Sequence, residues 1–261
     1  NALRRLLHRP GYTALSLLVL SLGLGAMLFT LGAVNSMVLQ PLPFPQADRL
    51  VSMGFVRASS TSIGEMHGGD FLRLREGLQG VERMGAYARM TANLSQGGEA
   101  FPKRYEGVQF DLSMLDLLGV QPVLGRAFTA EEDRPGAAPV VLLAHRTWRD
   151  DFAADPAVLG RSVRLNGQPA TIIGVMPEGF QFPLIGELWL PRRLSSEDDT
   201  PVEVVARLAE GTGIEQLRVE LDGLIERLGP ELRSARDQRE PRLAPLTHRF
   251  VNETTRSLIW M

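Results

Sequence analysis

The strongest pattern in the chain is a long apolar stretch near its N-terminus. Residues 10–39 contain no charged side chain, and residues 12–39 are almost entirely apolar. Because a helix needs about 20 apolar residues to cross the hydrocarbon of a bilayer, this stretch predicts a transmembrane helix over residues 12–39. A cleaved signal peptide is the alternative, but its apolar region is only about 7–15 residues long. We therefore expect an uncleaved anchor.

The charges that flank this anchor predict its orientation in the membrane. The three arginines of the tail, residues 1–11, have no acidic residue beside them. Basic residues favour the cytoplasmic side of a membrane, so we expect a cytoplasmic tail and an outside location for everything after about residue 39. The chain ends within a second apolar run that holds Trp260. We expect a fragment of a longer protein in which residues 251–261 begin another transmembrane helix.

Beyond the anchor, a proline at every second position of residues 41–45 predicts an extended connector. The pattern that follows is strand, helix, strand. Residues 50–56 are strand-like, Asp70 is a candidate N-cap for an amphipathic helix, and residues 83–94 return as a strand.

The same order recurs near the C-terminal end. Residues 201–208 alternate as a strand does, residues 212–215 fit a capping box, and the apolar positions that follow predict a helix. Gly229 and Pro230 end that helix, and residues 242–246 fit a closing strand. Two β-α-β units far apart in the sequence predict a discontinuous α+β layer that an insertion interrupts.

This pattern divides the outside part of the chain into three segments. Residues 40–105 form the first part of the layer, residues 106–195 an inserted subdomain, and residues 196–250 the second part. The polar run of residues 195–200 is the expected link between the insertion and the second part.

Short elements are expected within the insertion. Residues 140–143 fit a buried strand, residues 145–152 a short helix, and residues 155–156 the start of another. Asn166 and Gly167 stand between two strand-like runs, where both central residues of a type I′ turn need a positive φ. This pair therefore predicts a β-hairpin.

Composition and charge remove several function classes. The chain has 28 Lys+Arg against 30 Asp+Glu, which leaves no basic footprint for a nucleic acid. It has no cysteine, so disulfides, thiolate nucleophiles and cysteine metal sites are excluded. Its one lysine, Lys103, does not follow a glycine-rich loop, which excludes a Walker A nucleotide site.

Candidate catalytic chemistry is sparse, and we expect neither an enzyme nor a bound cofactor or metal. The serine-hydrolase elbow and the zinc-protease helix motif are absent, and His67, His145 and His248 have no ligand spacing. An unrecognised extracytoplasmic hydrolase that used His145 is the alternative. The acidic run of residues 131–133 lacks a calcium-loop pattern and fits a solvated charge run.

A series of ordered motifs runs through the insertion. Its residues are Gly119, Pro122, Gly125, Arg126, Phe128, Trp148, Phe152, Asp155, Pro156, Gly160, Asn166, Gly167, Gly174, Pro177, Phe180, Trp189 and Pro191. The series resembles the MacB-like periplasmic core domain of ABC transporter permeases, in the FtsX-like and duplicated orphan-permease branch. Ala144 stands where that family usually has serine. We interpret the aromatic residues as core anchors and the glycines as turn or close-approach positions, so this signature marks a scaffold.

The resemblance implies a fold and a function. The fold is an N-terminal transmembrane helix followed by a porter-like α+β domain of two β-α-β units with an inserted mixed α/β subdomain. The function is that of a permease subunit in the bacterial inner membrane, with its main domain in the periplasm. It implies a separate cytoplasmic ABC ATPase, a homodimer or paired permease, the lipid bilayer and a periplasmic adaptor as partners.

Three functions remain open at this point. The first is export, in which ATP hydrolysis by the partner drives efflux through mechanotransmission to the outside domain. The second is a regulatory signalling module that acts on an extracytoplasmic partner such as a cell-wall hydrolase. The third is a binding domain on a single anchor.

Overall fold

The computed structural model describes residues 10–34, 42–56, 63–96, 101–229, 231–237 and 239–250. The chain divides into two compact units, residues 43–246 and a second unit made of residues 1–42 and 247–261. The described helices of the second unit are α2 (Pro10–Val34) and α8 (Thr247–Phe250).

Of the helices in the described part of the chain, none is long and apolar enough to span a membrane. The transmembrane helix predicted over residues 12–39 is therefore not confirmed. Its last five residues lie outside the described residues, as do residues 1–9 of the predicted tail and residues 251–261 of the predicted second helix.

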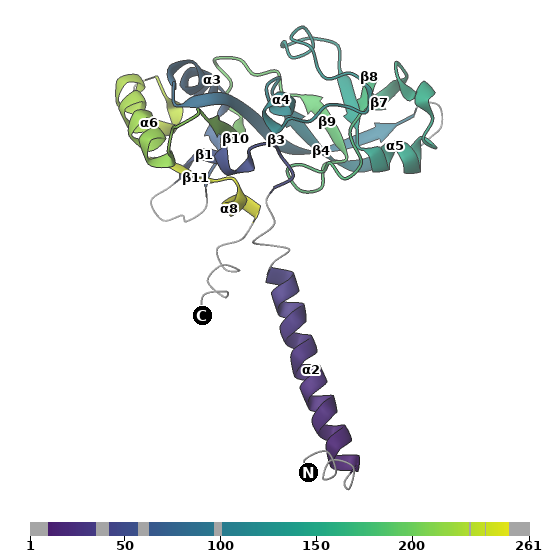
Figure 1. Ribbon diagram of the computed structural model, residues 1–261. Coiled ribbons are helices and arrows are strands. Elements are labelled where there is room, and N and C mark those ends of the chain that lie inside the picture. The colour runs from purple at the N-terminus through teal and green to yellow at the C-terminus, as the bar shows by residue number, and fades with distance from the viewer. Residues whose placement is uncertain are drawn as a thin grey trace. The chain divides into compact units, whose positions relative to one another are not determined.

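The unit of residues 43–246 is built on one mixed sheet (Figure 1). Its strands are β1 (Leu50–Val56), β2 (Met66–His67), β3 (Val81–Ser95), β4 (Lys103–Phe110), β5 (Leu124–Gly125), β6 (Val140–Leu143), β7 (Ser162–Leu165), β8 (Gln168–Val175), β9 (Leu188–Pro191), β10 (Pro201–Leu208) and β11 (Glu240–Pro245). Its helices are α3 (Gly68–Gly77), α4 (Met114–Leu118), α5 (His145–Asp151), α6 (Ile214–Leu228) and α7 (Arg233–Arg236), with short 3₁₀ turns at Ala47–Arg49 and Pro156–Val158. The main path through the sheet is β11-β1-β10-β3-β4-β9-β6-β8-β5.

One half of this sheet interleaves the two ends of the chain. β10 lies between β1 and β3 and is antiparallel to both, so β1 and β3 run in the same direction with α3 between them in the sequence. β1 in turn lies between β10 and β11, which α6 connects. Each helix thus joins two parallel strands that are separated by a strand of the other pair.

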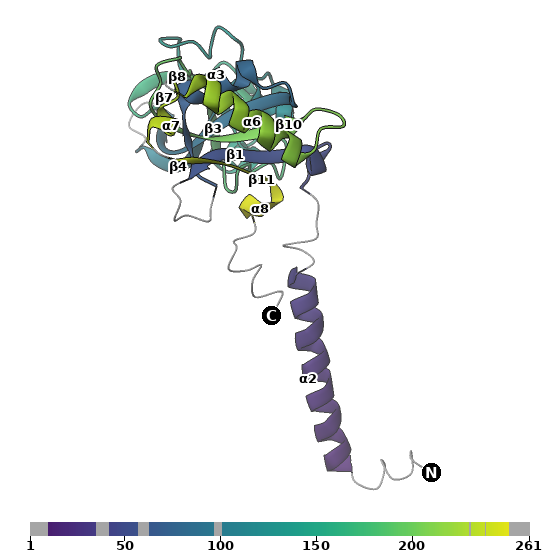
Figure 2. The ribbon, with the colours of Figure 1, turned by 90° about the vertical axis from the view of Figure 1, so that its left-hand side faces the viewer.

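Helices α3 and α6 lie over this half of the sheet (Figure 2), and their apolar side chains pack against it. Every second residue of β1, Val51, Met53 and Phe55, belongs to the same core as Phe71 of α3 and Leu221 of α6. The period of two in the strand and the helical spacing in α6 therefore bury their apolar faces against each other.

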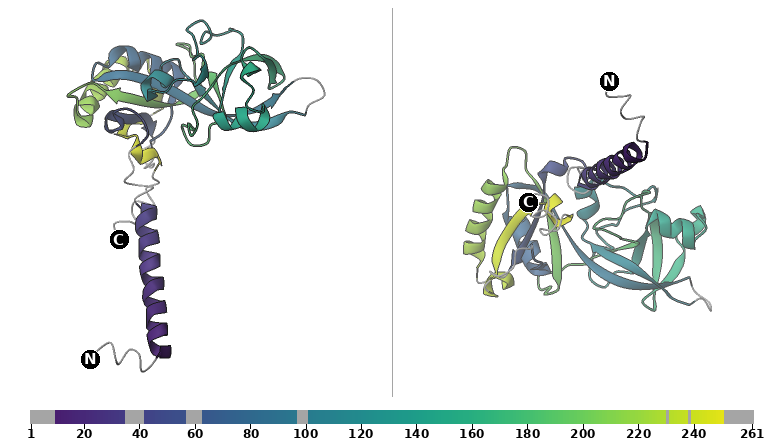
Figure 3. Two further views of the ribbon diagram at one scale, coloured as in Figure 1. Left: turned by 45° about the vertical axis from the view of Figure 1, so that its right-hand side comes forward. Right: turned by 90° about the horizontal axis from the view of Figure 1, so that it is seen from below.

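The other half has its own core around α5, β6, β8 and β9, to which Val141, Phe152 and Ile172 contribute. The 15 residues of β3 pass from one core to the other, pairing with β10 at residues 81–87 and with β7 at residues 94–95. Figure 3 shows this long blue strand running from the yellow-green end of the unit to the teal end. The boundary predicted between residues 105 and 106 falls within β4, so the sheet continues across it.

Several local predictions are confirmed. β1, β6 and β10 have the residues predicted for them, and α6 ends before Gly229. Asn166 and Gly167 have φ values of 50° and 83° and join β7 to β8 as the predicted hairpin. The closing strand β11 begins two residues earlier than predicted.

Two predicted helix caps are wrong. α3 begins after His67, and the Asp70 carboxylate instead accepts hydrogen bonds from the backbone N–H groups of Arg233 and Ser234, at 3.0 and 2.8 Å. Asp70 therefore caps α7. α6 begins after Gly213 with no side-chain cap, so residues 212–215 form no capping box. In the first case, packing of distant segments supplied the carboxylate with a better partner than its own helix.

Candidate functional site

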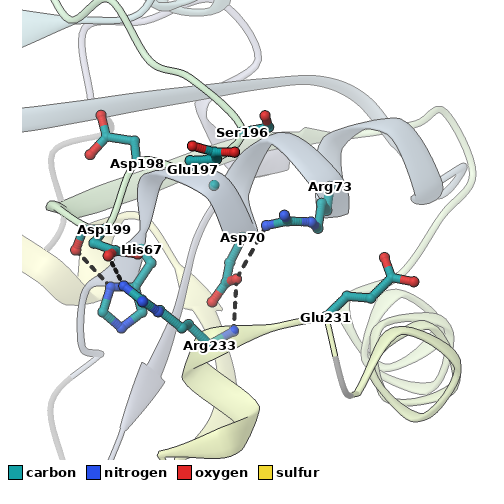
Figure 4. Close-up of a pocket in the computed structure, with 10 residues that line it drawn as sticks. His67, Asp70, Arg73, Ser196, Glu197, Asp198, Asp199, Glu231 and Arg233 are labelled. Atoms are coloured by element: carbon teal, nitrogen blue, oxygen red, sulfur yellow. Dashed lines mark hydrogen bonds and ion pairs between the residues drawn. The ribbon is translucent and has the colours of Figure 1, made fainter.

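A polar cleft of about 350 Å³ lies where α3 begins (Figure 4). It is lined by His67, Asp70 and Arg73 from the start of α3, by residues 196–199 of the polar link, and by Glu231 and Arg233 near α7. Three segments far apart in the sequence therefore meet at this cleft.

Backbone contacts hold the polar link against the start of α3. The N–H of Gly68 donates to the carbonyl of Thr200 at 3.0 Å, and that of Gly69 donates to Asp198 at 2.8 Å. A Cβ at Gly69 would lie 2.4 Å from the carbonyl oxygen of Ser196, so only glycine allows this approach.

Most charged side chains that line the cleft form ion pairs or hydrogen bonds with neighbouring residues. Asp199 forms an ion pair with Arg233, and its carbonyl accepts a hydrogen bond from Nδ1 of His67 at 2.7 Å (Figure 4). Nε2 of His67 lies 3.6 Å from the Asp237 carboxylate, and the buried Asp70 caps α7. These pairs join the three segments.

A second cavity of about 260 Å³ lies beside α5. His145, Pro177, Phe180 and Glu187 line it, and the His145 ring packs edge-on against Trp148, with 5.3 Å between centroids. His67 and His145 thus line separate cavities, so the fold does not bring these two histidines together. Within the described ranges, His, Asp and Glu side chains form no group of three able to hold a metal ion.

Most of the signature aromatic residues are buried. Trp189 on β9 is fully buried, and its Nε1 donates to the carbonyl of Phe182 at 3.1 Å. Phe180 packs against it, with 5.1 Å between ring centroids. Phe152 and Phe128 are buried as well, whereas Trp148 is half-buried and donates to the carbonyl of Asp155 at 2.9 Å.

The signature glycines lie at turns or close approaches. Gly119, Gly125 and Gly160 have φ values of 66°, 80° and 77°, a backbone region that favours glycine. Gly174 on β8 has the carbonyl oxygens of Leu124 and Arg126 2.9 Å from the position of a Cβ.

The remaining signature residues stand at the ends of elements. Asp155 accepts from the N–H of Ala157 at 2.9 Å, and Pro156 is the first residue of the 3₁₀ turn that follows. Pro122 precedes β5, Pro177 follows β8, and Pro191 is the last residue of β9.

Of the acidic run of residues 131–133, Glu131 is exposed, but Glu132 and Asp133 are not the solvated charges that were predicted. Glu132 pairs with Arg126 at 2.6 Å, and the N–H of Thr129 donates to it at 2.9 Å. Asp133 accepts from the backbone N–H groups of Arg193 at 2.8 Å and Leu112 at 3.3 Å, and desolvation raises the pKa of its carboxyl. Asp133 therefore fastens its loop to two other segments, and the expectation failed at Asp133 because Leu112 and Arg193 lie 21 and 60 residues away in the sequence.

The sequence pattern did not predict that charged groups are buried near the middle of the sheet. Asp111 at the end of β4 accepts from the N–H of Ala86 at 3.0 Å and from the Arg75 guanidinium at 3.1 Å. Burial raises the pKa of the Asp111 carboxyl to about 6. Glu203 and Arg207 are buried on β10, where single charges inside the apolar run of residues 202–208 were the available signal.

Comparison with known proteins places this arrangement in a family. The profile described as the MacB-like periplasmic core domain matches residues 13–224. No curated protein sequence matches the chain. Similar solved structures include a permease-protein domain from Porphyromonas gingivalis, with 18% identity and a TM-score of 0.59 over 77% of this chain and 92% of that one.

Two further structures have the same fold. The extracellular domain of the noncanonic ABC-type transporter YknZ from Gram-positive bacteria has 17% identity and a TM-score of 0.56 over 75% of this chain and 99% of that one. The periplasmic region of MacB from Actinobacillus actinomycetemcomitans has 15% identity and a TM-score of 0.58 over 82% and 94%. Because the family profile covers most of the sequence, the chain belongs to the MacB-like periplasmic core domain family.

Proposed function

We propose that the chain is the anchored extracytoplasmic part of an export-type ABC permease subunit. In this function a separate ATPase in the cytoplasm hydrolyses ATP, and the membrane segments carry the resulting movement to the outside domain, which helps to extrude the cargo. Family membership supports the proposal, since similar structures in this family's fold include domains of a permease protein and of an ABC-type transporter.

One geometric observation carries the mechanical part of the proposal. β1, the first strand of the unit, pairs with β11, the last. The N–H of Leu246 donates to the carbonyl of Leu50 at 2.9 Å, so the chain enters and leaves the unit at one place. A domain held at a single place by both of its ends can follow a relative movement of two membrane segments.

Residues 12–39 are the proposed anchor. The lack of charge over residues 10–39 supports it, as do the apolar side chains that α2 exposes, such as Leu20 at 71% and Phe29 at 80%. Residues 251–261 would begin the second membrane helix. A second permease copy and a periplasmic adaptor are the further partners of the proposed assembly.

Cysteine labelling tests the proposed topology, because the natural chain has no cysteine. In intact spheroplasts we expect a membrane-impermeant maleimide to label Val219→Cys, whose side chain is 74% exposed in the outside domain. Ala2→Cys should react only after permeabilisation, and Leu217→Cys, fully buried, serves as the unreactive control. Labelling of the Ala2 variant in intact spheroplasts would overturn the proposed orientation.

Transport is tested by replacing residues 43–246 with a flexible linker in the complete permease. We expect efflux to be lost while the partner still hydrolyses ATP. Retained efflux, together with loss of activity of a co-purifying cell-wall hydrolase, would refute the transport proposal in favour of signalling.

A further inference from the structure

The segment through which the chain enters the outside domain has an unusual backbone. This entry turn, residues 43–49, contains Gln46 with φ 51° and ψ 45°, the left-handed region. A residue other than glycine is uncommon there and persists only when its surroundings hold it. Contacts with neighbouring residues must therefore hold Gln46 in this conformation.

Arg207 on the central strand β10 provides several of these contacts. Its Nη1 donates to the carbonyl oxygen of Pro45 at 2.8 Å and to Oε1 of Gln46 at 3.0 Å. Its Nη2 donates to the carbonyl oxygen of Leu117 at the end of α4. The side chain is only 6% exposed, so loss of either partner leaves buried charge poorly solvated.

The entry turn also packs against α4 and the second half of the unit. A Cβ at Gly119, which ends α4, would lie 2.7 Å from Cγ of Pro45. The Phe44 ring contacts Phe182 edge-on, with 5.7 Å between centroids. A displacement of the entry turn must therefore change its contacts with both α4 and Phe182.

Arg49, the last residue of the entry turn, contacts other elements than Arg207 does. Its Nε donates to the carbonyl of Leu208 at 2.9 Å, and its guanidinium also pairs with Glu82 on β3. Neither partner belongs to α4. Arg207 differs because one guanidinium joins the turn, β10 and α4.

We propose that Arg207 couples movement of the entry turn to α4, and that the left-handed turn at Gln46 is the element that changes state. The inference rests on the proposed function, in which force reaches the domain through this segment. When the turn relaxes, Arg207 loses its acceptors at Pro45 and Gln46, and its hold on the Leu117 carbonyl changes with them.

Hydrogen exchange in the full chain, measured in detergent, tests the coupling. The readout is the peptide with the amides of Gly119 and Val120, which donate to α4 carbonyls at 3.1 and 3.0 Å. Gln46→Gly removes the backbone strain and the side-chain acceptor that Arg207 and Arg49 share. Because a hydrogen bond to a charged group contributes about 1.5–3 kcal/mol, we expect exchange of this peptide to become roughly tenfold faster or more.

The Gln46→Gly effect should then depend on Arg207. In the background of Arg207→Met, which keeps an unbranched apolar chain, and of Arg207→Lys, which keeps the charge, we expect Gln46→Gly to change exchange less than twofold. Thermal unfolding shows whether each Arg207 variant folds. If one of the two does not fold, the other is used to test the coupling. Arg83→Met is the matched control, since Arg83 contacts α4 through Asp116 at 3.3 Å and not through the entry turn.

Two results would overturn the coupling. One is unchanged exchange at Gly119 and Val120 in Gln46→Gly, and the other is a full effect in both Arg207 backgrounds. The readout needs neither the ATPase nor cargo. Failure of transport with intact coupling would therefore refute only the proposed function, and failure of coupling in a transporting permease would refute only this inference.

Discussion

Replacing Asp111 with asparagine should change how the stability of the protein depends on pH. The Asp111 carboxyl is buried at the end of β4, and burial raises its pKa from 3.8 to about 6. The hydrogen bond from Ala86 and the Arg75 guanidinium favour the ionised form but do not offset desolvation. Asparagine keeps an acceptor for Ala86 and cannot ionise.

The sign follows from comparing the folded and unfolded states. Because the pKa is higher in the folded state, that state binds the proton more tightly, and its stabilisation is complete below about pH 4. The stabilisation is lost as pH rises through about 6. A shift of about 2 pKa units corresponds to about 3 kcal/mol of unfolding free energy.

Urea unfolding of the full chain, followed by tryptophan fluorescence, measures this effect. Between pH 4 and pH 7.5, the unfolding free energy of the natural protein should fall by about 2.5 kcal/mol relative to Asp111→Asn. Asp116→Asn is the control: its side chain is 58% exposed in the neighbouring α4, and its difference from the natural protein should stay nearly constant. A pH-independent difference for Asp111→Asn would refute a raised pKa at this site.

Three further predictions concern stability. Trp189→Ala removes a fully buried ring and should lower the unfolding free energy by about 3–5 kcal/mol in the same urea assay, whereas a loss below about 1 kcal/mol would contradict its place in the core. Gly167→Ala, at φ 83°, should lower the unfolding free energy by about 1 kcal/mol or more. Gly223→Ala lies within α6 with open space around its Cβ and should raise the unfolding free energy by about 0.5–1 kcal/mol. Equal effects of the two variants would contradict the backbone argument. Asp70→Ala removes the cap of α7 and should cost about 0.5–2 kcal/mol, with faster hydrogen exchange at Ser234 but not within α6; unchanged exchange at Ser234 would rule out the cap.

Much of the local structure could be predicted because its causes lie within a few residues. Asn166 and Gly167 tolerate the positive φ that their turn requires, and the alternation of residues 201–208 and the apolar run of residues 140–143 suit strands. The ordered motifs between Gly119 and Pro191 were sufficient to indicate the family that the profile match then showed.

Only the tertiary structure decided which distant segments pair with one another. Asp70 and Asp133 find backbone donors 163 and 60 residues away, and Arg207 finds the carbonyl of Pro45 162 residues away. β3 passes through both cores because its two ends meet different strands. Local propensity acts over one or two turns of chain, whereas these contacts depend on which segments packing brings together. For that reason the sequence alone could indicate the family and most elements, and the buried charges that join them became visible only in the folded protein.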